Sequence, residues 1–172
     1  MRYNSIVYND TVNGKGMRIS FFTQGCSHHC KDCFNKELGW DFDGGKKLTK
    51  EVVDNMFFVF ETYGKYYDGL SILGGEPLDN IEVTTLLINK FRTMFGNTKD
   101  IWIWSGYTFE EILKDENKLK IIKECDVLID GRFEKDLKDL KLKHRGSSNQ
   151  RIINVQESLK QNEVIEYDWS DN

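Results

Sequence analysis

The chain has 172 residues, with no alanine, a single proline and only four cysteines. No apolar run approaches the ~20 residues of a membrane-spanning helix, and four cysteines are too few for a disulfide scaffold. A hydrophobic fraction of 39% and a charged fraction of 30% are typical of a folded globular chain rather than a disordered one. The formal net charge of −4 argues against a general nucleic-acid coat. We therefore expect neither a membrane nor a nucleic acid as partner.

The first ten residues are polar and aromatic and contain no apolar core of a signal peptide, so we expect a cytoplasmic protein. Cysteines in that reducing compartment bind metals or catalyse reactions more often than they form disulfides. No internal repeat and no low-complexity linker divides the chain. We therefore expect residues 1–172 to form a single domain.

Short apolar segments alternate with amphipathic segments along the chain. We expect strands at 18–23, 70–73, 101–104, 127–130 and 151–155, and helices at 49–63, from Asp79 or Asn80 to about Gly96, and from a capping box at Thr108 and Glu111. Such alternation predicts an α/β fold with a parallel sheet. A closed eight-stranded barrel needs ~250 residues, so we expect an open partial (β/α) barrel of about five or six mostly parallel strands.

Three of the four cysteines, Cys26, Cys30 and Cys33, lie within eight residues, directly after the first expected strand, with the spacing C-x3-C-x2-C. A structural zinc site takes four protein ligands, whereas a cubane iron–sulfur cluster takes one ligand per iron. Three thiolates without an evident fourth ligand leave one iron open for a substrate. His28 or His29 can complete a Cys3His zinc site, which makes a non-enzymatic zinc-binding module an alternative. Both histidines, however, lie between the ligands on a tight loop, where closing a tetrahedron is awkward.

Other polar candidates follow the later strands. Gly74 and Gly75 let the backbone approach a ligand closely or adopt positive φ, and Glu76 adds a carboxylate. Ser105 and Asp130 end the next two expected strands, where ligand contacts are expected in this architecture. A plain turn explains these two positions equally well.

Two further features have an ordinary explanation. Cys125 precedes an expected strand and is more simply a buried apolar cysteine than a fourth metal ligand. Residues 132–151 contain seven Lys or Arg and three Asp or Glu, a local net charge of +4. Such a run is by default a solvated face, although it can also steer an acidic partner surface.

Four segments together resemble the radical S-adenosylmethionine (SAM) superfamily and, within it, the family of activating proteins for the glycyl-radical enzyme anaerobic ribonucleoside-triphosphate reductase. They are FTQGCSHHCKDCFN at 22–35, LGGEP at 73–77, WSGY at 104–107 with DVLIDG at 126–131, and RGSSNQR at 145–151. The cysteine spacing marks the superfamily, and the RGSSNQR run marks the narrower family. One departure is that many members have an aromatic residue just before the third cysteine, where this chain has Asp32, followed after the cysteine by Phe34.

The resemblance implies that Cys26, Cys30 and Cys33 hold a [4Fe-4S] cluster and are the catalytic residues. SAM would bind to the open iron and be cleaved reductively to a 5′-deoxyadenosyl radical. That radical would take a hydrogen atom from a glycine of the reductase large subunit, with a flavodoxin-like protein as electron donor. The implied cofactor-binding residues are Asp32, Cys33 and Phe34 near the adenine, Gly74, Gly75 and Glu76 near the methionine end, and Ser105 and Asp130.

A radical SAM enzyme that acts on another substrate, such as a small molecule, is the nearer alternative. It would share the cysteine loop and the Gly-Gly turn. Such an enzyme usually needs extra segments to enclose its substrate, and 172 residues leave little length for them.

Overall fold

The computed structural model describes residues 1–168, apart from the side chains of residues 37 and 38. Within this part of the chain, seven strands form one sheet in the order β3-β1-β2-β4-β5-β6-β7. The strands are β1 (Arg2–Asp10), β2 (Arg18–Thr23), β3 (Lys46–Lys47), β4 (Gly69–Gly74), β5 (Asp100–Trp104), β6 (Val127–Asp130) and β7 (Arg151–Asn154). The central strands β2, β4, β5 and β6 are mutually parallel, whereas β1, β3 and β7 pair antiparallel with their neighbours.

The architecture is mixed α/β, and the sheet has more strands than the five or six expected from the sequence. The main addition is β1, whose residues are mostly polar or aromatic and mostly half-buried or exposed, because this strand lies near the edge of the sheet. The edge strand β3 has only two residues, both exposed. The sheet is open, and its description as a partial (β/α) barrel stays a prediction.

Six α-helices are described: α1 (Lys36–Gly39), α2 (Lys50–Tyr63), α3 (Ile81–Phe95), α4 (Phe109–Ile112), α5 (Glu116–Ile122) and α6 (Val155–Gln161). Two helix starts expected from the sequence are confirmed. The Thr49 side chain accepts a hydrogen bond from the Val52 N–H and caps α2, and Thr108 and Glu111 form a reciprocal capping box at α4. No helix in residues 1–168 is long and apolar enough to cross a membrane.

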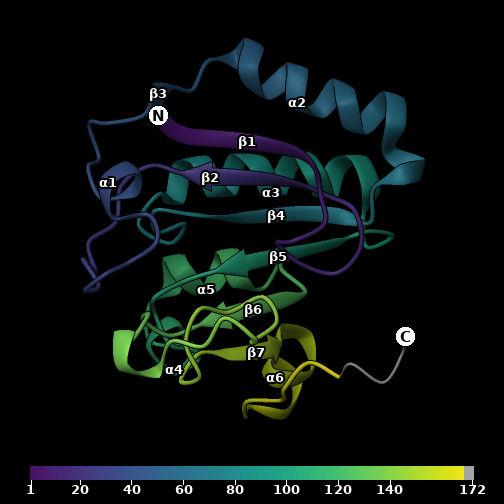
Figure 1. The fold of residues 1–172 in the computed structure, drawn as a ribbon. Coiled ribbons are helices and arrows are strands. Elements are labelled where there is room, and N and C mark those ends of the chain that lie inside the picture. The colour runs from purple at the N-terminus through teal and green to yellow at the C-terminus, as the bar shows by residue number, and fades with distance from the viewer. Residues whose placement is uncertain (169–172) are drawn as a thin grey trace.

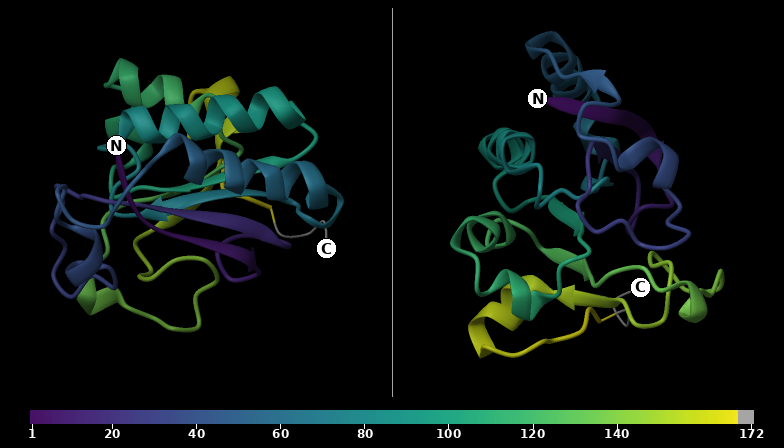
Figure 2. Two further views of the ribbon diagram at one scale, coloured as in Figure 1. Left: turned by 90° about the horizontal axis from the view of Figure 1, so that it is seen from above. Right: turned by 90° about the vertical axis from the view of Figure 1, so that its left-hand side faces the viewer.

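Three helices and one long irregular segment lie on opposite faces of the sheet. Helices α3, α5 and α6 are gathered on one face, and the segment between β6 and β7 lies on the other (Figures 1 and 2). The side chains of successive strand residues point to opposite faces of the sheet. Ile101 and Ile103 belong to the large core, while Trp102 belongs to a smaller cluster. The central strands are therefore buried on both sides, which explains their continuous apolar sequences.

The carboxyl ends of the four parallel strands meet at one edge of the sheet, at the left of Figure 1, where α1 also lies. The cysteine loop follows β2, the Gly-Gly-Glu-Pro turn follows β4, and Ser105 and Gly131 follow β5 and β6. Motifs that are far apart in the sequence are thus brought to the same edge, as expected for a parallel sheet.

Gly74 ends β4 with φ at 111°, a conformation that other residues rarely adopt. A Cβ at this position would lie 2.7 Å from the Thr23 backbone nitrogen and 2.8 Å from the Phe22 Cα. Both atoms belong to the paired strand β2 and cannot move aside. Only glycine therefore allows β4 to turn into the site at this point.

Replacing Gly74 by alanine is expected to lower the free energy of unfolding by roughly 1–3 kcal/mol from backbone strain alone. The clash with β2 should add at least about 1 kcal/mol. Gly96→Ala is the matched control, because Gly96 also has positive φ, at 53°, but a Cβ added there would have nothing within 4 Å. Urea unfolding of both iron-free variants measures the difference. An equal loss in the two variants would show that the close approach at Gly74 is unimportant.

Candidate metal centre

The three clustered cysteines line one cavity of about 150 Å³ at the carboxyl edge of the sheet. Of the other residues predicted from the sequence, the same cavity is lined by Gly74, Gly75, Glu76 and Ser105. The structure therefore brings together the cysteine loop and the turns after β4 and β5.

Local contacts hold the cysteine loop in an irregular conformation. The Cys33 N–H donates to the Cys30 carbonyl at 3.2 Å, which folds the C-x2-C segment into a turn. His29 and Asp32 adopt positive φ at 49° and 58°, so the chain changes direction between the cysteines. The Asn35 side chain then donates to the Gly74 carbonyl at 2.9 Å and ties the end of the loop to β4.

Cys26 is buried, Cys30 and Cys33 are half-buried, and each of the three sulfur atoms lies near a backbone N–H group. Burial raises the pKa of Cys26 to about 11, although the N–H groups of His28 and His29 act in the opposite direction. Burial also raises the pKa of Cys30, with the Phe133 N–H opposing it. The Asn35 N–H lies 3.4 Å from the Cys33 sulfur. Backbone N–H groups aimed at thiolates are the environment that iron–sulfur clusters use.

Within residues 1–168, no group of three His, Cys, Asp or Glu side chains is placed to hold one metal ion. A single zinc ion needs its ligands to converge on one point, whereas a cubane takes each thiolate at a separate corner. Three thiols on one loop, with N–H donors directed at the sulfur atoms, are a donor set that fits a [4Fe-4S] cluster.

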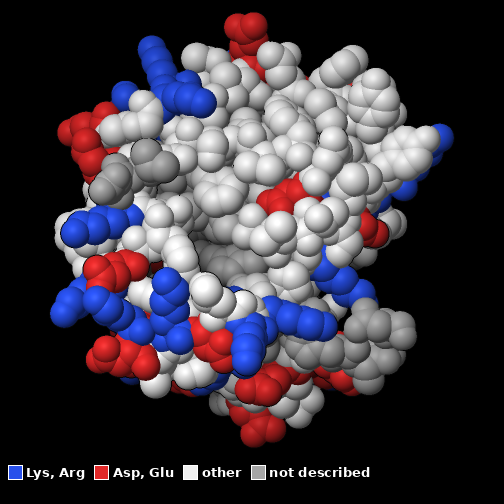
Figure 3. Space-filling view, viewed as in Figure 1, with Lys and Arg blue, Asp and Glu red and all other residues white. Residues whose placement is uncertain are grey.

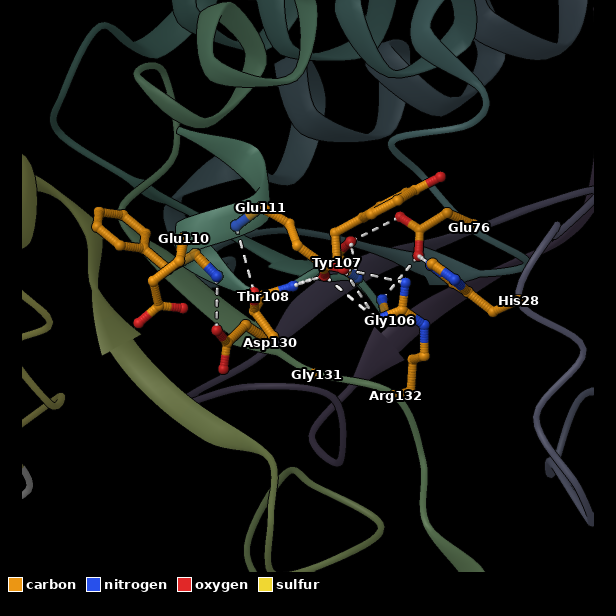
Figure 4. A network of polar contacts seen from close by, with 12 residues as sticks. His28, Glu76, Gly106, Tyr107, Thr108, Glu110, Glu111, Asp130, Gly131 and Arg132 are labelled. Carbon is orange, nitrogen blue, oxygen red and sulfur yellow. Dashed lines mark hydrogen bonds and ion pairs between the residues drawn. The ribbon is translucent and has the colours of Figure 1, made fainter. Parts of the chain in front are cut away.

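The carboxylate of Glu76 is the centre of the polar contacts beside this cavity (Figure 4). It is 1% exposed. One oxygen accepts from the Ser105 hydroxyl at 2.8 Å and the Leu78 N–H at 2.9 Å. The other accepts from the Gly106 N–H at 2.7 Å and lies 3.1 Å from His28 Nε2. Glu76 thus joins the turns after β4 and β5 to the cysteine loop.

A second carboxylate, Asp79, reinforces the same junction. It accepts from the Ser27 N–H at 2.9 Å and from the Tyr107 hydroxyl at 2.8 Å. The Tyr107 ring in turn meets the His28 ring edge-on, with centroids 4.4 Å apart. A Cβ on Gly106 would lie 2.3 Å from the His28 ring, so this glycine is what lets the histidine approach.

The sequence pattern indicates His28 only as a zinc ligand and gives Asp79 no part in the site. The structure assigns His28 to the contact between the cysteine loop and Glu76. Its side chain is 5% exposed, which is unusual for a histidine on a surface loop. The only signal in the sequence is its place between two cysteines, which does not say where the ring points.

Three other candidates lie outside the cavity lining. Asp130 is buried, but it accepts hydrogen bonds from the Phe109 N–H and from Arg151. Its neighbour Gly131 lines the cavity instead. The Asp32 side chain is exposed and pairs with Lys135 at 2.5 Å. Phe34 is 62% exposed and packs edge-on against Phe133.

The fourth cysteine, Cys125, is completely buried, as expected for an apolar cysteine. Its sulfur lies 3.5 Å from the Ile121 carbonyl, and burial raises the pKa of its thiol. It belongs to the large core and does not line the cavity of the three clustered cysteines.

A second, larger cavity of about 510 Å³ adjoins the first and shares six lining residues with it, among them Cys33, Trp104 and Gln150. Gln150 belongs to the RGSSNQR run. Its side chain accepts from the Gly146 and Ser147 N–H groups and donates to the Gly131 carbonyl. The run is therefore folded against the mouth of the first cavity. Figure 3 shows a hollow on this face bordered by uncharged surface, with charged side chains crowded below it.

Comparison with known proteins agrees with this site. The 4Fe-4S single cluster domain family matches residues 12–153, so the chain is an α/β protein of an iron–sulfur class. It is 36% identical over 154 residues to the anaerobic ribonucleoside-triphosphate reductase-activating protein of Escherichia coli K12, covering 88% of this chain and 97% of that protein. The protein of the same name from Enterobacteria phage T4 is 38% identical, covering 88% and 93%. The chain belongs to this family of activating proteins.

The Glu76 contacts predict that Glu76→Gln, which replaces one carboxylate oxygen by an NH2 group, lowers the free energy of unfolding. In Glu76→Gln, an amide NH2 group must face at least one of the buried N–H donors and leave it without an acceptor. Each such loss costs about 1–3 kcal/mol, so the free energy of unfolding of the iron-free protein should fall by that amount or more. The exposed Glu82, in the first turn of α3, provides the control Glu82→Gln, expected within about 0.5 kcal/mol of wild type. Equal stability of the two variants would contradict the proposed junction.

The raised pKa of Cys26 predicts how its alkylation depends on pH. With a pKa of about 11, only ~0.1% of this thiol is ionised near pH 8. Because the thiolate is the nucleophile, the rate of iodoacetamide alkylation in iron-free protein should rise about tenfold per pH unit from pH 7 to 10. Timed alkylation followed by peptide mass spectrometry measures this rate. A rate that levels off below pH 9 would show that Cys26 is not desolvated as described.

Proposed function

We propose that this protein is a radical SAM activating enzyme that generates a glycyl radical on anaerobic ribonucleoside-triphosphate reductase. The observation that carries the proposal is the cavity in which Cys26, Cys30 and Cys33 meet the Gly-Gly-Glu turn after β4. The names of the relatives support the choice of reductase. The matched iron–sulfur family supports the cluster.

The three cysteines would hold a [4Fe-4S] cluster, each on one iron. When bound, the cluster supplies the electron for reductive cleavage of SAM to methionine and a 5′-deoxyadenosyl radical, which takes a hydrogen atom from a glycine of the partner. The remaining tasks fall to the chain, which binds, orients and shields the reactants.

The turn after β4 is the proposed site for the methionine end of SAM. Gly75 brings its backbone against the Gly25 carbonyl so closely that a Cβ would lie 2.3 Å from that oxygen. Both glycines line the cavity beside the cysteines, where the Gly75 N–H donates to the Thr23 carbonyl and the Gly74 carbonyl accepts from Asn35. The Glu76 carboxylate already accepts hydrogen bonds from Ser105, Leu78 and Gly106. We therefore assign its side chain to holding the turn and the cysteine loop in place.

The larger adjoining cavity is the proposed entry for the glycine-bearing loop of the reductase. It opens beside exposed apolar side chains, Phe34 at 62% and Leu140 at 82% exposure. Half of its lining residues belong to the basic segment 132–151. An opening of this kind suits a protein segment presented by a larger partner. A flavodoxin-like electron donor and a cytoplasmic location complete the proposal, because the thiols need a reducing compartment.

Anaerobic reconstitution of the wild-type protein should give about four irons per chain. Cleavage of SAM with a strong reductant should fall to background in Cys26→Ala, Cys30→Ala and Cys33→Ala, because each removes one ligand of the cluster. Cys125→Ala is the matched control and should keep nearly full activity, since Cys125 lies in the core.

Two outcomes would contradict the proposed function. Full SAM cleavage by Cys30→Ala would show that the reaction does not require the cysteine loop. Protein purified without oxygen that contains zinc and no iron would favour the zinc-binding module instead.

A further inference from the structure

Trp40 follows α1 and lines the same cavity as the three clustered cysteines. Its indole Nε1 is buried, and among the residues that the structure describes it has no hydrogen-bond acceptor. Leaving a buried donor unpaired costs about 1–3 kcal/mol, and native proteins rarely do so without a reason. This indole N–H is thus a donor that the described protein groups leave unsatisfied, on a side chain that lines the cavity.

Trp40 differs from the other buried polar side-chain atoms that lack a hydrogen-bond partner. In the described part of the chain, these are Ser20 Oγ, Asp100 Oδ1 and Asn149 Oδ1. Asp100 Oδ1 lies 2.6 Å from the Arg18 guanidinium, and Ser20 acts on the carboxylate of Asp10. None of the three residues lines the cysteine cavity, which leaves Trp40 as the unsatisfied donor of this site.

The position of Trp40 is fixed beside the first cysteine. The Cys26 N–H donates to the Trp40 carbonyl at 3.3 Å, and the Gly25 N–H donates to the Gly39 carbonyl at 2.9 Å. The indole ring packs against the His29 ring, with centroids 4.8 Å apart. The Lys36 ammonium lies 5.7 Å from its centroid. These contacts hold the ring in place, so the N–H cannot turn to solvent without breaking them.

We propose that the indole N–H of Trp40 donates a hydrogen bond to a sulfur atom of the iron–sulfur cluster and raises its reduction potential. The inference rests on the cluster being held by Cys26, Cys30 and Cys33, as proposed above. Reduction adds negative charge to the cluster, and a donor directed at its sulfur stabilises that charge. Trp40 is thus a residue that tunes the cluster.

Trp40→Phe tests this role, because it keeps an aromatic ring and removes the N–H. Trp104→Phe is the matched control: Trp104 lines the same cavity, but its Nε1 already donates to the His144 carbonyl at 2.7 Å. The readouts are iron per chain and the ratio of reduced to oxidised cluster at a fixed solution potential, followed by EPR without SAM.

We expect Trp40→Phe to load as much iron as wild type and its reduced-to-oxidised ratio to fall roughly three- to tenfold, where tenfold corresponds to 59 mV for one electron. The reduced-to-oxidised ratio of Trp104→Phe should stay within about twofold of the wild-type ratio. An unchanged ratio in iron-loaded Trp40→Phe would overturn the inference and leave the proposed function intact. A shift that appears only after SAM is added would also overturn it, because the acceptor would then be SAM. Failure of wild-type protein to load iron would instead contradict the proposed function.

A second measurement covers the case in which Trp40→Phe does not load iron. Trp104→Phe protein is labelled with 15N in its indole rings, and the reduced cluster is studied by pulsed EPR. We expect the cluster signal to show a 15N coupling and an exchangeable-proton coupling from Trp40, the tryptophan that remains in the cavity. The absence of both couplings from a fully loaded cluster would overturn the inference.

Discussion

The carboxylate of Glu76 is buried at the point where three loops meet, and its two oxygens face four hydrogen-bonding groups. Burying a charged carboxylate is costly unless its hydrogen bonds are satisfied, so the loops that supply the donors must keep their relative positions. These loops carry the three cysteines, the Gly-Gly turn and Ser105. The proposed cluster site and the proposed SAM site therefore share one polar centre, and displacing one loop would disturb both.

The rest of the site follows from this constraint. Asp79 holds Ser27 and Tyr107, and Tyr107 packs against His28, so the cysteine loop is fixed from two sides. At the end of the basic segment, Arg151 pairs with Asp130 and Glu110. The same guanidinium lowers the pKa of Glu110 to about 2, so this contact persists throughout the neutral range. Within the same segment, Leu140 is 82% exposed.

Much of this could be predicted from the sequence, because strand ends and helix caps depend on local patterns. The strand Arg18–Thr23, the cap at Thr49 and the capping box at Thr108 are local features of this kind. The direction in which a side chain points is not a local feature and could not be predicted in this way. Asp130 ends a strand as expected, but its carboxylate accepts the Phe109 N–H and pairs with Arg151. The strand β1 was missed because most of its residues are polar or aromatic and lie near a sheet edge, where an apolar pattern is not required.

The central claim is that the three cysteines of this chain support the formation of a protein radical. The most direct test is anaerobic incubation of the iron-loaded protein with anaerobic ribonucleoside-triphosphate reductase, SAM and a strong reductant, followed by EPR. We predict the doublet of a glycyl radical on the reductase, dependent on SAM and absent when Cys30→Ala replaces the wild-type protein. A reductase without this doublet, despite a fully loaded and reduced cluster, would contradict the claim.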